Sequence, residues 1–195
     1  RFESDDTFSY QFRSGREIRT NRKFRDTSAW YHIVAVADSS QATASNRMKL
    51  YVNGVQETSF SASTYQDQNQ ASPGWGKYST YNFTVGAATN ATRNFNGYLA
   101  EVYYIDGQVL DPTYFGEFDD DTGIWKPKAF TGTFGSLDTY LDFSNASDLG
   151  ENSGGTTDLN ENSVDSSNQA TDTPTNNSAT WNALFHASGA NDGYA

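Results

Sequence analysis

Three stretches of the sequence decide the fold: Trp30-Tyr-His-Ile-Val-Ala-Val-Ala-Asp38, Met48-Lys-Leu-Tyr-Val-Asn-Gly-Val-Gln56 and Phe95-Asn-Gly-Tyr-Leu-Ala-Glu-Val-Tyr-Tyr-Ile-Asp-Gly-Gln-Val-Leu110. Each is rich in β-branched and aromatic residues, and Gly, Asn or Asp lies at its boundaries, which is typical of strands separated by turns. No helical pattern of apolar residues lies among them. The sequence therefore predicts an all-β protein.

The most specific local signal is the dipeptide Asn53-Gly54. Both positions tolerate positive φ, so it predicts a two-residue type I′ hairpin between strands at 48–52 and 55–60. The 30–37 run is apolar on both faces, which favours a strand in the middle of a sheet. The remaining expected elements are strands at 6–12, 17–20, 82–87, 98–105 and 139–143, a loop at 61–80 and one helical turn at 111–115.

Composition excludes some classes of partner. The formal net charge is −11, which disfavours binding to nucleic acid and to anionic membranes, because both depend on an excess of Lys and Arg. No apolar run is long enough to predict insertion into a membrane. The chain contains no cysteine, which is consistent with folding in a reducing cytoplasm.

The polarity of the chain changes near residue 143. Residues 144–180 have no aromatic residue and are dominated by Asn, Ser, Thr, Asp and Gly. Such a segment buries too little apolar area to offset a backbone entropy of about 1–2 kcal/mol per residue. We therefore expect a β domain over 1–143, a polar linker or extended arm over 144–180, and a tail or the start of another element over 181–195.

The strand sequences resemble a known superfamily. Trp30-Tyr-His-Ile-Val34 followed by Asn46-Arg-Met-Lys-Leu-Tyr-Val-Asn-Gly54 resembles the concanavalin A-like lectin/glucanase superfamily, in its laminin-G and pentraxin-like branch. The stretches Phe95–Leu110, Phe115-Gly-Glu-Phe-Asp119 and Thr122-Gly-Ile-Trp-Lys-Pro127 resemble modules of marine bacteriophage virion proteins, such as tail fibres. Asp172-Thr-Pro-Thr-Asn-Asn177 resembles the same group.

The resemblance implies a jelly-roll sandwich of two antiparallel sheets. It also implies one or two strands before Phe8 that this sequence does not show, and a neighbouring chain or a longer polypeptide would supply them. For function it implies a virion location after folding in the bacterial host cytoplasm. The partners would be other virion proteins, further copies of the chain, as in a trimer, and a host surface glycan.

Catalytic motifs are absent from the sequence. A glucanase of this superfamily would carry paired carboxylates in a Glu-x-Asp-x-x-Glu pattern, whereas Glu101 stands alone on its expected strand. The chain has two histidines. His32 lies within an apolar strand, which favours a packed residue over a catalytic base, and His186 lies in the tail. The sequence therefore predicts a protein that is not an enzyme.

The expected 61–80 loop carries a sugar-binding pattern. Aromatic faces stack on the apolar face of a pyranose, while amides and carboxylates bind its hydroxyls. The alternative is that the loop tryptophan only anchors the loop to the sandwich. The candidate carbohydrate-binding residues are Tyr65, Asp67, Asn69, Trp75, Tyr78 and Tyr81.

Two acidic segments are weak candidates for calcium, the metal that many members of the resembling superfamily bind. The segment 158–165 lacks the glycine at the sixth position and the glutamate at the twelfth that an EF-hand loop requires, and the segment 119–121 lies next to an expected turn. Solvated acidic turns are the simpler interpretation. The candidate ligands are Asp119, Asp120, Asp121, Asp158, Asn160, Asn162 and Asp165.

Together these observations predict a structural or adhesion protein of a bacteriophage particle that binds a host glycan, as a tail fibre, appendage or capsid decoration. One alternative is a carbohydrate-binding module of a larger bacterial surface protein or enzyme. Another is a divergent glycoside hydrolase.

Overall fold

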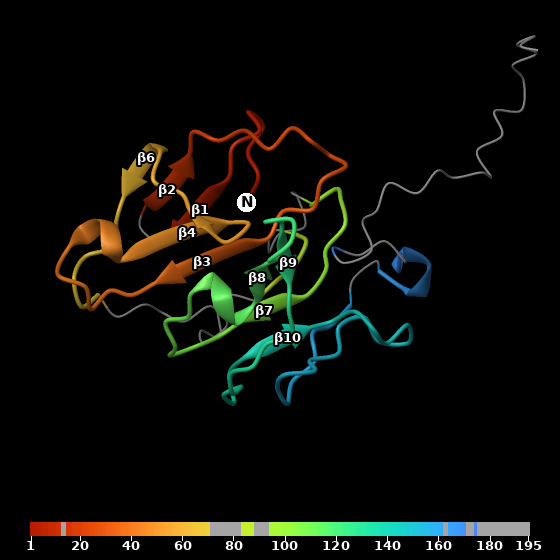
Figure 1. The fold of residues 1–195 in the computed structure, drawn as a ribbon. Helices are drawn as coiled ribbons and strands as arrows, with labels where there is room; N and C mark the ends of the chain where they lie inside the picture. Colours follow the sequence, from red (N-terminus) through yellow and green to blue (C-terminus); the bar gives the residue numbers. More distant parts are fainter. Residues whose placement is uncertain (13–14, 71–82, 88–93, 162–163, 171–173, 175–195) are drawn as a thin grey trace, which may run out of the picture.

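The computed structural model describes residues 1–12, 15–70, 83–87, 94–161, 164–170 and 174. Within these residues, ten short β-strands form four antiparallel sheets, and the only helices are three single 3-10 turns. The all-β prediction is confirmed, and the arrangement is that of a concanavalin A-like sandwich (Figure 1).

The first sheet has the strand order β1-β2-β6. Strands β1 (Ser9–Phe12) and β2 (Arg16–Thr20) form a hairpin in which Tyr10 lies opposite Ile18, as the alternation of the sequence predicts. Strand β6 (Phe60–Thr64) then pairs with β2. The expected 61–80 loop therefore begins later than predicted, because its first residues complete this sheet.

The second sheet has the strand order β3-β4-β5. It consists of β3 (Ile33–Ala37), β4 (Met48–Val52), which follows the 3-10 turn η1 (Ala44–Asn46), and β5 (Val55–Gln56). The hairpin prediction is confirmed, since φ is 48° at Asn53 and 77° at Gly54.

Two details of this sheet differ from the prediction. Among the described residues β4 is the middle strand, and β3 pairs with β4 alone. The strand expected over 55–60 ends at Gln56, where the chain leaves this sheet and enters the other one as β6. Alternation of side chains does not show on which sheet a residue run will pair, because that depends on neighbours distant in sequence.

The core lies where these two sheets face each other. Tyr10 and Ile18 from the first sheet pack with Met48 and Leu50 from β4, and all four are buried. Full burial of one such side chain stabilises the fold by about 1.5–3 kcal/mol. The half-buried side chains around this core cluster are Phe8, Phe12, Ile33, Phe60 and Tyr65.

A further layer lies beyond the two sheets. Strand β7 (Val102–Tyr104) pairs with β10 (Thr139–Leu141), and β8 (Gly116–Phe118) pairs with β9 (Trp125–Pro127). The 3-10 turn η2 (Pro112–Tyr114) precedes β8, and its first turn is capped by Asp111, which accepts a hydrogen bond from the backbone N–H of Thr113. This confirms the helical turn expected at 111–115.

Aromatic rings cover one face of the β7–β10 pair. Tyr103 and Tyr140 are cross-strand neighbours, and their rings stack with centroids 4.2 Å apart. Phe134 stacks on Tyr140 at 5.9 Å, and Phe130 joins it to the buried Phe115. Offset stacking of this kind contributes about 0.5–1.5 kcal/mol per pair beyond the burial of area. Residues after 112 thus give the β7–β10 pair a second core.

Several expected strands are shorter or absent. The strand predicted over 98–105 is confined to β7, because Glu101 has a φ of 51° that an extended strand cannot contain. Residues 83–87 form no strand, and only Ala87 makes an isolated bridge, with Asn94. The strand expected over 139–143 is present as β10, but it ends at Leu141, and Phe143 has a φ of 54°.

The polar segment after residue 143 contacts the sandwich along residues 144–161. The buried side chain of Asn152 accepts a hydrogen bond from the backbone N–H of Tyr140 and donates one to the carbonyl of Asp138. Leu149 is also buried. This part of the arm is irregular in backbone but fixed to β10 by side-chain bonds. The domain boundary at 143 stays a prediction.

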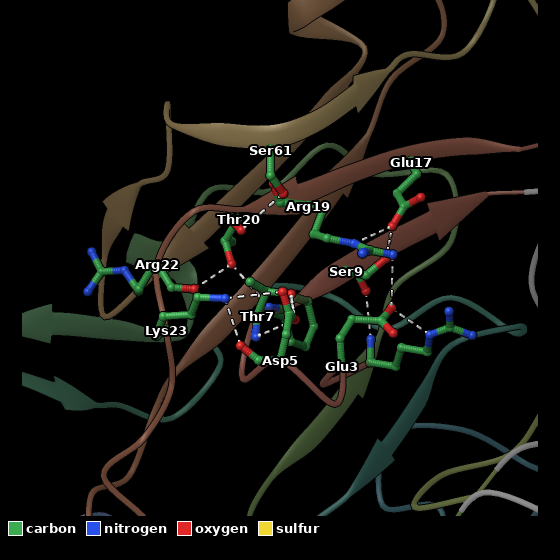
Figure 2. Close-up of polar contacts among 12 residues, drawn as sticks. Glu3, Asp5, Thr7, Ser9, Glu17, Arg19, Thr20, Arg22, Lys23 and Ser61 are labelled. Carbon is green, nitrogen blue, oxygen red and sulfur yellow. Dashed lines mark hydrogen bonds and ion pairs between the residues drawn. The ribbon is translucent and has the colours of Figure 1, made fainter.

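A polar network holds the beginning of the chain against β2 (Figure 2). The buried Thr20 accepts a hydrogen bond from the backbone N–H of Phe8 at 3.0 Å and donates its hydroxyl to the carbonyl of Arg22 at 2.9 Å. Nearby, the Thr7 hydroxyl and Lys23 bind Asp5, and these hydrogen bonds lower the pKa of Asp5 to about 2. This carboxylate therefore stays charged over the physiological pH range.

We predict that Thr20→Val lowers the free energy of unfolding by about 1–3 kcal/mol, because valine has a similar shape but makes neither of these two partly buried hydrogen bonds. Urea denaturation measures this. The matched control is Ser61→Ala, since that hydroxyl is exposed and reaches its carbonyl acceptors only at 3.4 Å. Equal effects of the two substitutions would contradict the prediction.

Candidate functional site

Three connecting segments meet at one end of the sandwich. They are Arg16 at the start of β2, the 38–47 connection between β3 and β4, and residues 65–70 after β6. Register brings the first and last together, because Glu17 lies opposite Thr64. We call these three segments the loop rim.

The loop rim contains half of the residues predicted to bind carbohydrate. Asp67 and Asn69 are exposed on it. Tyr65 is half-buried, and its ring packs against the core cluster. Burying an aromatic ring against apolar side chains is favourable, and the end of β6 places Tyr65 within reach of that core. The other candidates, Trp75, Tyr78 and Tyr81, lie outside the described residues.

Arg47 ties the two longer rim segments together. Its guanidinium donates to the carbonyls of Gln41 and Ala42, both at 2.7 Å, and to that of Gln66 at 3.0 Å. A planar guanidinium suits this task because its donors point in fixed directions. In the sequence analysis, Arg47 was noted only as part of the stretch that resembles the superfamily. Its bracing role was missed because the acceptors are backbone atoms, which no pattern of side chains reveals.

Asp38 fixes the beginning of the 38–47 connection. Its carboxylate accepts hydrogen bonds from the hydroxyl and backbone N–H of Ser40 and from the side chain of Gln41. The bond from the Ser40 hydroxyl is the main reason that the pKa of Asp38 is lowered. Across the rim, the backbone N–H of Asn69 donates to the carbonyl of Ser39 at 2.8 Å. The rim backbone is thus held by many short bonds.

Asp67 is the most exposed charged group of the loop rim, with 69% of its side chain accessible. Its Oδ2 accepts a hydrogen bond from Nη2 of Arg16 at 2.6 Å, and the Arg16 side chain is only 27% exposed. Two buried donors nearby, Nε of Arg16 and Nε2 of Gln66, have no hydrogen-bond partner among the described residues. The rim therefore presents the exposed carboxylate of Asp67, which is hydrogen-bonded to the less exposed guanidinium of Arg16.

The first acidic segment proposed for calcium forms a turn between β8 and β9. Asp119 accepts bonds from the backbone N–H groups of Asp121 and Thr122 and from the Thr122 hydroxyl, which close the β8–β9 turn. Together with Lys126 these bonds lower the pKa of Asp119 to about 2. Asp120 is exposed, and the acids do not converge on a common point.

The second acidic segment is also occupied by local capping. Asp158 accepts a hydrogen bond from the backbone N–H of Asn152, and Asp165 caps the 3-10 turn η3 (Ser166–Asn168). Asn160 is exposed, and Asn162 lies outside the described residues. Among the described residues, no group of three or more His, Cys, Asp or Glu side chains could hold a metal ion. Calcium ligation by these positions stays a prediction.

A second carboxyl group, from a distant segment of the chain, lies near Glu101. Partial burial of its carboxyl group raises the pKa of Glu101, and the charge of Asp142, which follows β10, raises it further. The pKa of Asp142 is lowered, since hydrogen bonds from Ser144 and Ser153 outweigh its desolvation. No sequence pattern could find this pair, because the two residues are far apart in the chain.

His32 is packed, in agreement with the sequence interpretation. Its Nδ1 accepts a hydrogen bond from Nε1 of Trp125 at 3.0 Å, and the two rings stack. Glycines at 54 and 116 allow this approach, because a Cβ at either position would collide with the Trp125 ring. This contact joins the second sheet to the β8–β9 hairpin. The second histidine, His186, lies outside the described residues.

Comparison with models of protein families shows to which superfamily the chain belongs. A family model described as the concanavalin A-like lectin/glucanases superfamily matches residues 1–112, which is more than half of the 195 residues. The chain belongs to this superfamily. Searches of curated proteins and of solved structures found no match.

The superfamily match covers the first two sheets and the loop rim, whereas most of the aromatic layer on β7–β10 lies beyond residue 112. The recognition of the concanavalin A-like superfamily from sequence is confirmed. In the described part of the chain, there is no helix with the length and apolar character needed to cross a bilayer.

We predict that Arg47→Lys destabilises the protein by about 1.5–3 kcal/mol, the usual contribution of hydrogen bonds to a charged group. An ammonium group cannot donate to three separated carbonyls in a fixed plane. Stability should therefore fall even though lysine keeps the positive charge. Urea denaturation gives the magnitude, and amide exchange should quicken in the loop rim. Arg25→Lys is the matched control because Arg25 is exposed and, among the described residues, pairs only with the exposed Asp6.

We also predict a pH-dependent contribution from the His32–Trp125 contact. Burial lowers the pKa of His32 from its ordinary 6.5, so the folded state favours the neutral ring. The stabilisation is therefore complete above that value and is lost as the pH falls through the lowered pKa.

The measurement is the difference in unfolding free energy between the wild type and His32→Asn, followed from pH 8 to pH 5, roughly the range over which histidine titrates. The difference should shrink toward the acidic end. The control variant is His186→Asn, which removes the other histidine. A difference independent of pH for His32→Asn would contradict the assignment.

Proposed function

We propose that this chain is a non-catalytic carbohydrate-binding domain that attaches a bacteriophage particle to a glycan of the host surface. The observation that carries the proposal is the loop rim, a braced edge with exposed polar side chains on a sandwich of a lectin-containing superfamily.

The rim has suitable chemistry for sugar hydroxyls. The carboxylate of Asp67 accepts hydrogen bonds, and the exposed amides of Gln68 and Asn69 can both donate and accept them. The bonds of Arg47 and Asp38 already fix the rim backbone, so binding would cost little conformational entropy. Individual sugar contacts of this type are weak, and several copies on one particle would raise the overall affinity.

The assignment to a bacteriophage particle rests on stretches of sequence that resemble virion proteins, chiefly Phe95–Leu110 and the two stretches around β8 and β9. In that setting the partners are other virion proteins and further copies of the chain, in a trimer for a fibre. The protein would fold in the host cytoplasm and act on the extracellular particle. A carbohydrate-binding module of a larger bacterial surface protein or enzyme would use the same rim in the same way.

A second candidate function is a divergent glycoside hydrolase, and the Glu101–Asp142 pair favours it. Two nearby carboxyl groups whose pKa values are displaced in opposite directions are the usual arrangement of an acid and its partner. Against it, the carboxylate pattern of the superfamily's glucanases is missing from the sequence. We therefore keep the non-catalytic function as the proposal.

The test is a glycan array with the purified chain, followed by calorimetry on any polysaccharide bound. The double variant Gln68→Ala with Asn69→Gly should weaken binding by about tenfold, equivalent to about 1.4 kcal/mol for the lost hydrogen bonds. Glycine suits position 69 because φ there is 55°. Asn53→Gly is the matched control, since it makes the same exchange at a positive φ at the opposite end of β4.

Two outcomes would overturn the proposal. One is the absence of binding to every polysaccharide tested. The other is release of reducing sugar from a bound polysaccharide that Glu101→Gln abolishes, which would establish the hydrolase instead.

A further inference from the structure

The loop rim has few charged side chains, and all of them are described. They are two carboxylates, Asp38 and Asp67, and two guanidinium groups, Arg16 and Arg47. Lys49 lies close enough to Asp38 to lower its pKa further, but Met48 and Leu50 are buried on β4, so Lys49 points to the opposite, outer face of that strand. Among the described residues, the charge of the rim segments comes from these four side chains.

Both guanidinium groups are already engaged within the protein. Arg47 donates from Nε, Nη1 and Nη2 to three carbonyl oxygens. Arg16 donates from Nη2 to Asp67, and its Nε is buried and out of reach of solvent. Both groups therefore already donate to acceptors of the protein itself.

The two carboxylates differ in what they can offer. Both oxygens of Asp38 accept hydrogen bonds from the same connection. Asp67 uses Oδ2 for Arg16, and no described residue donates a hydrogen bond to its Oδ1. With most of its side chain exposed, Asp67 can accept hydrogen bonds from neighbouring sugar hydroxyls and would repel a second anion at the same place.

From these contacts we infer that the loop rim selects uncharged glycans and rejects uronic-acid and sulfated ones, with Asp67, held by Arg16, as the residue that determines this specificity. The inference rests on the proposed function and names its ligand class. The formal net charge of −11 acts in the same direction, because it lowers the rate at which polyanions approach.

The test uses matched pairs of polysaccharides that differ only in charge: laminarin with laminarin sulfate, and dextran with dextran sulfate. Host polysaccharide, separated into neutral and acidic fractions, is a third pair. Affinities are measured by calorimetry at physiological ionic strength. Within any pair that binds, we expect the wild type to prefer the neutral member.

Asp67→Asn keeps the side-chain shape and removes the charge, so it should reduce this preference by about fivefold, because two unit charges about 4 Å apart repel by about 1 kcal/mol in water. Asp121→Asn is the matched control, an exposed acid on the β8–β9 turn. Circular dichroism confirms that each variant is folded.

The outcomes separate this inference from the proposed function. If charged and neutral members bind equally, or if Asp67→Asn leaves their ratio unchanged, the specificity inference is wrong while carbohydrate binding stands. If no member of any pair binds, the proposed function fails and the inference fails with it.

Discussion

The packing of β4 against the β1–β2 hairpin is the contact on which the rest of the structure depends. Met48 and Leu50 meet Tyr10 and Ile18 there, and no other buried apolar cluster joins the two sheets among the described residues. The same strand fixes both ends of the sandwich. Arg47 precedes it at the loop rim, and the turn that follows it receives the Trp125 ring. Displacement of β4 would therefore disturb the rim and the β8–β9 hairpin together.

Rigidity of the loop rim has the same physical origin as the fold. Polar backbone atoms that leave a sheet must find partners, and here a single guanidinium satisfies three carbonyls in two separate segments. Because the frame is built from backbone bonds, the exposed side chains of residues 67–69 remain available to a ligand. A superfamily sandwich can in this way carry different specificities on the same edge.

Residues after 112 pack against the part of the chain that matches the superfamily. The rings of Phe115, Phe130 and Phe134 cover Tyr103 and Tyr140, and Asn152 is bonded to the same strand pair. The sequence pattern predicted β10 but not this layer, since aromatic residues in irregular segments have no periodicity to interpret. Polar composition after 143 likewise concealed the buried positions of Leu149 and Asn152.

The sequence by itself determined the features set by local chemistry. These are the alternation of apolar side chains in β1 and β2, the Asn53-Gly54 turn, the Asp111 cap and the stretch that resembles the superfamily. Tertiary structure decided which strand became central, that Tyr65 turned to the core, and that Asp67 met Arg16 across 51 residues of chain. Local rules act within a few residues, whereas these outcomes depend on which distant segments the two sheets bring together.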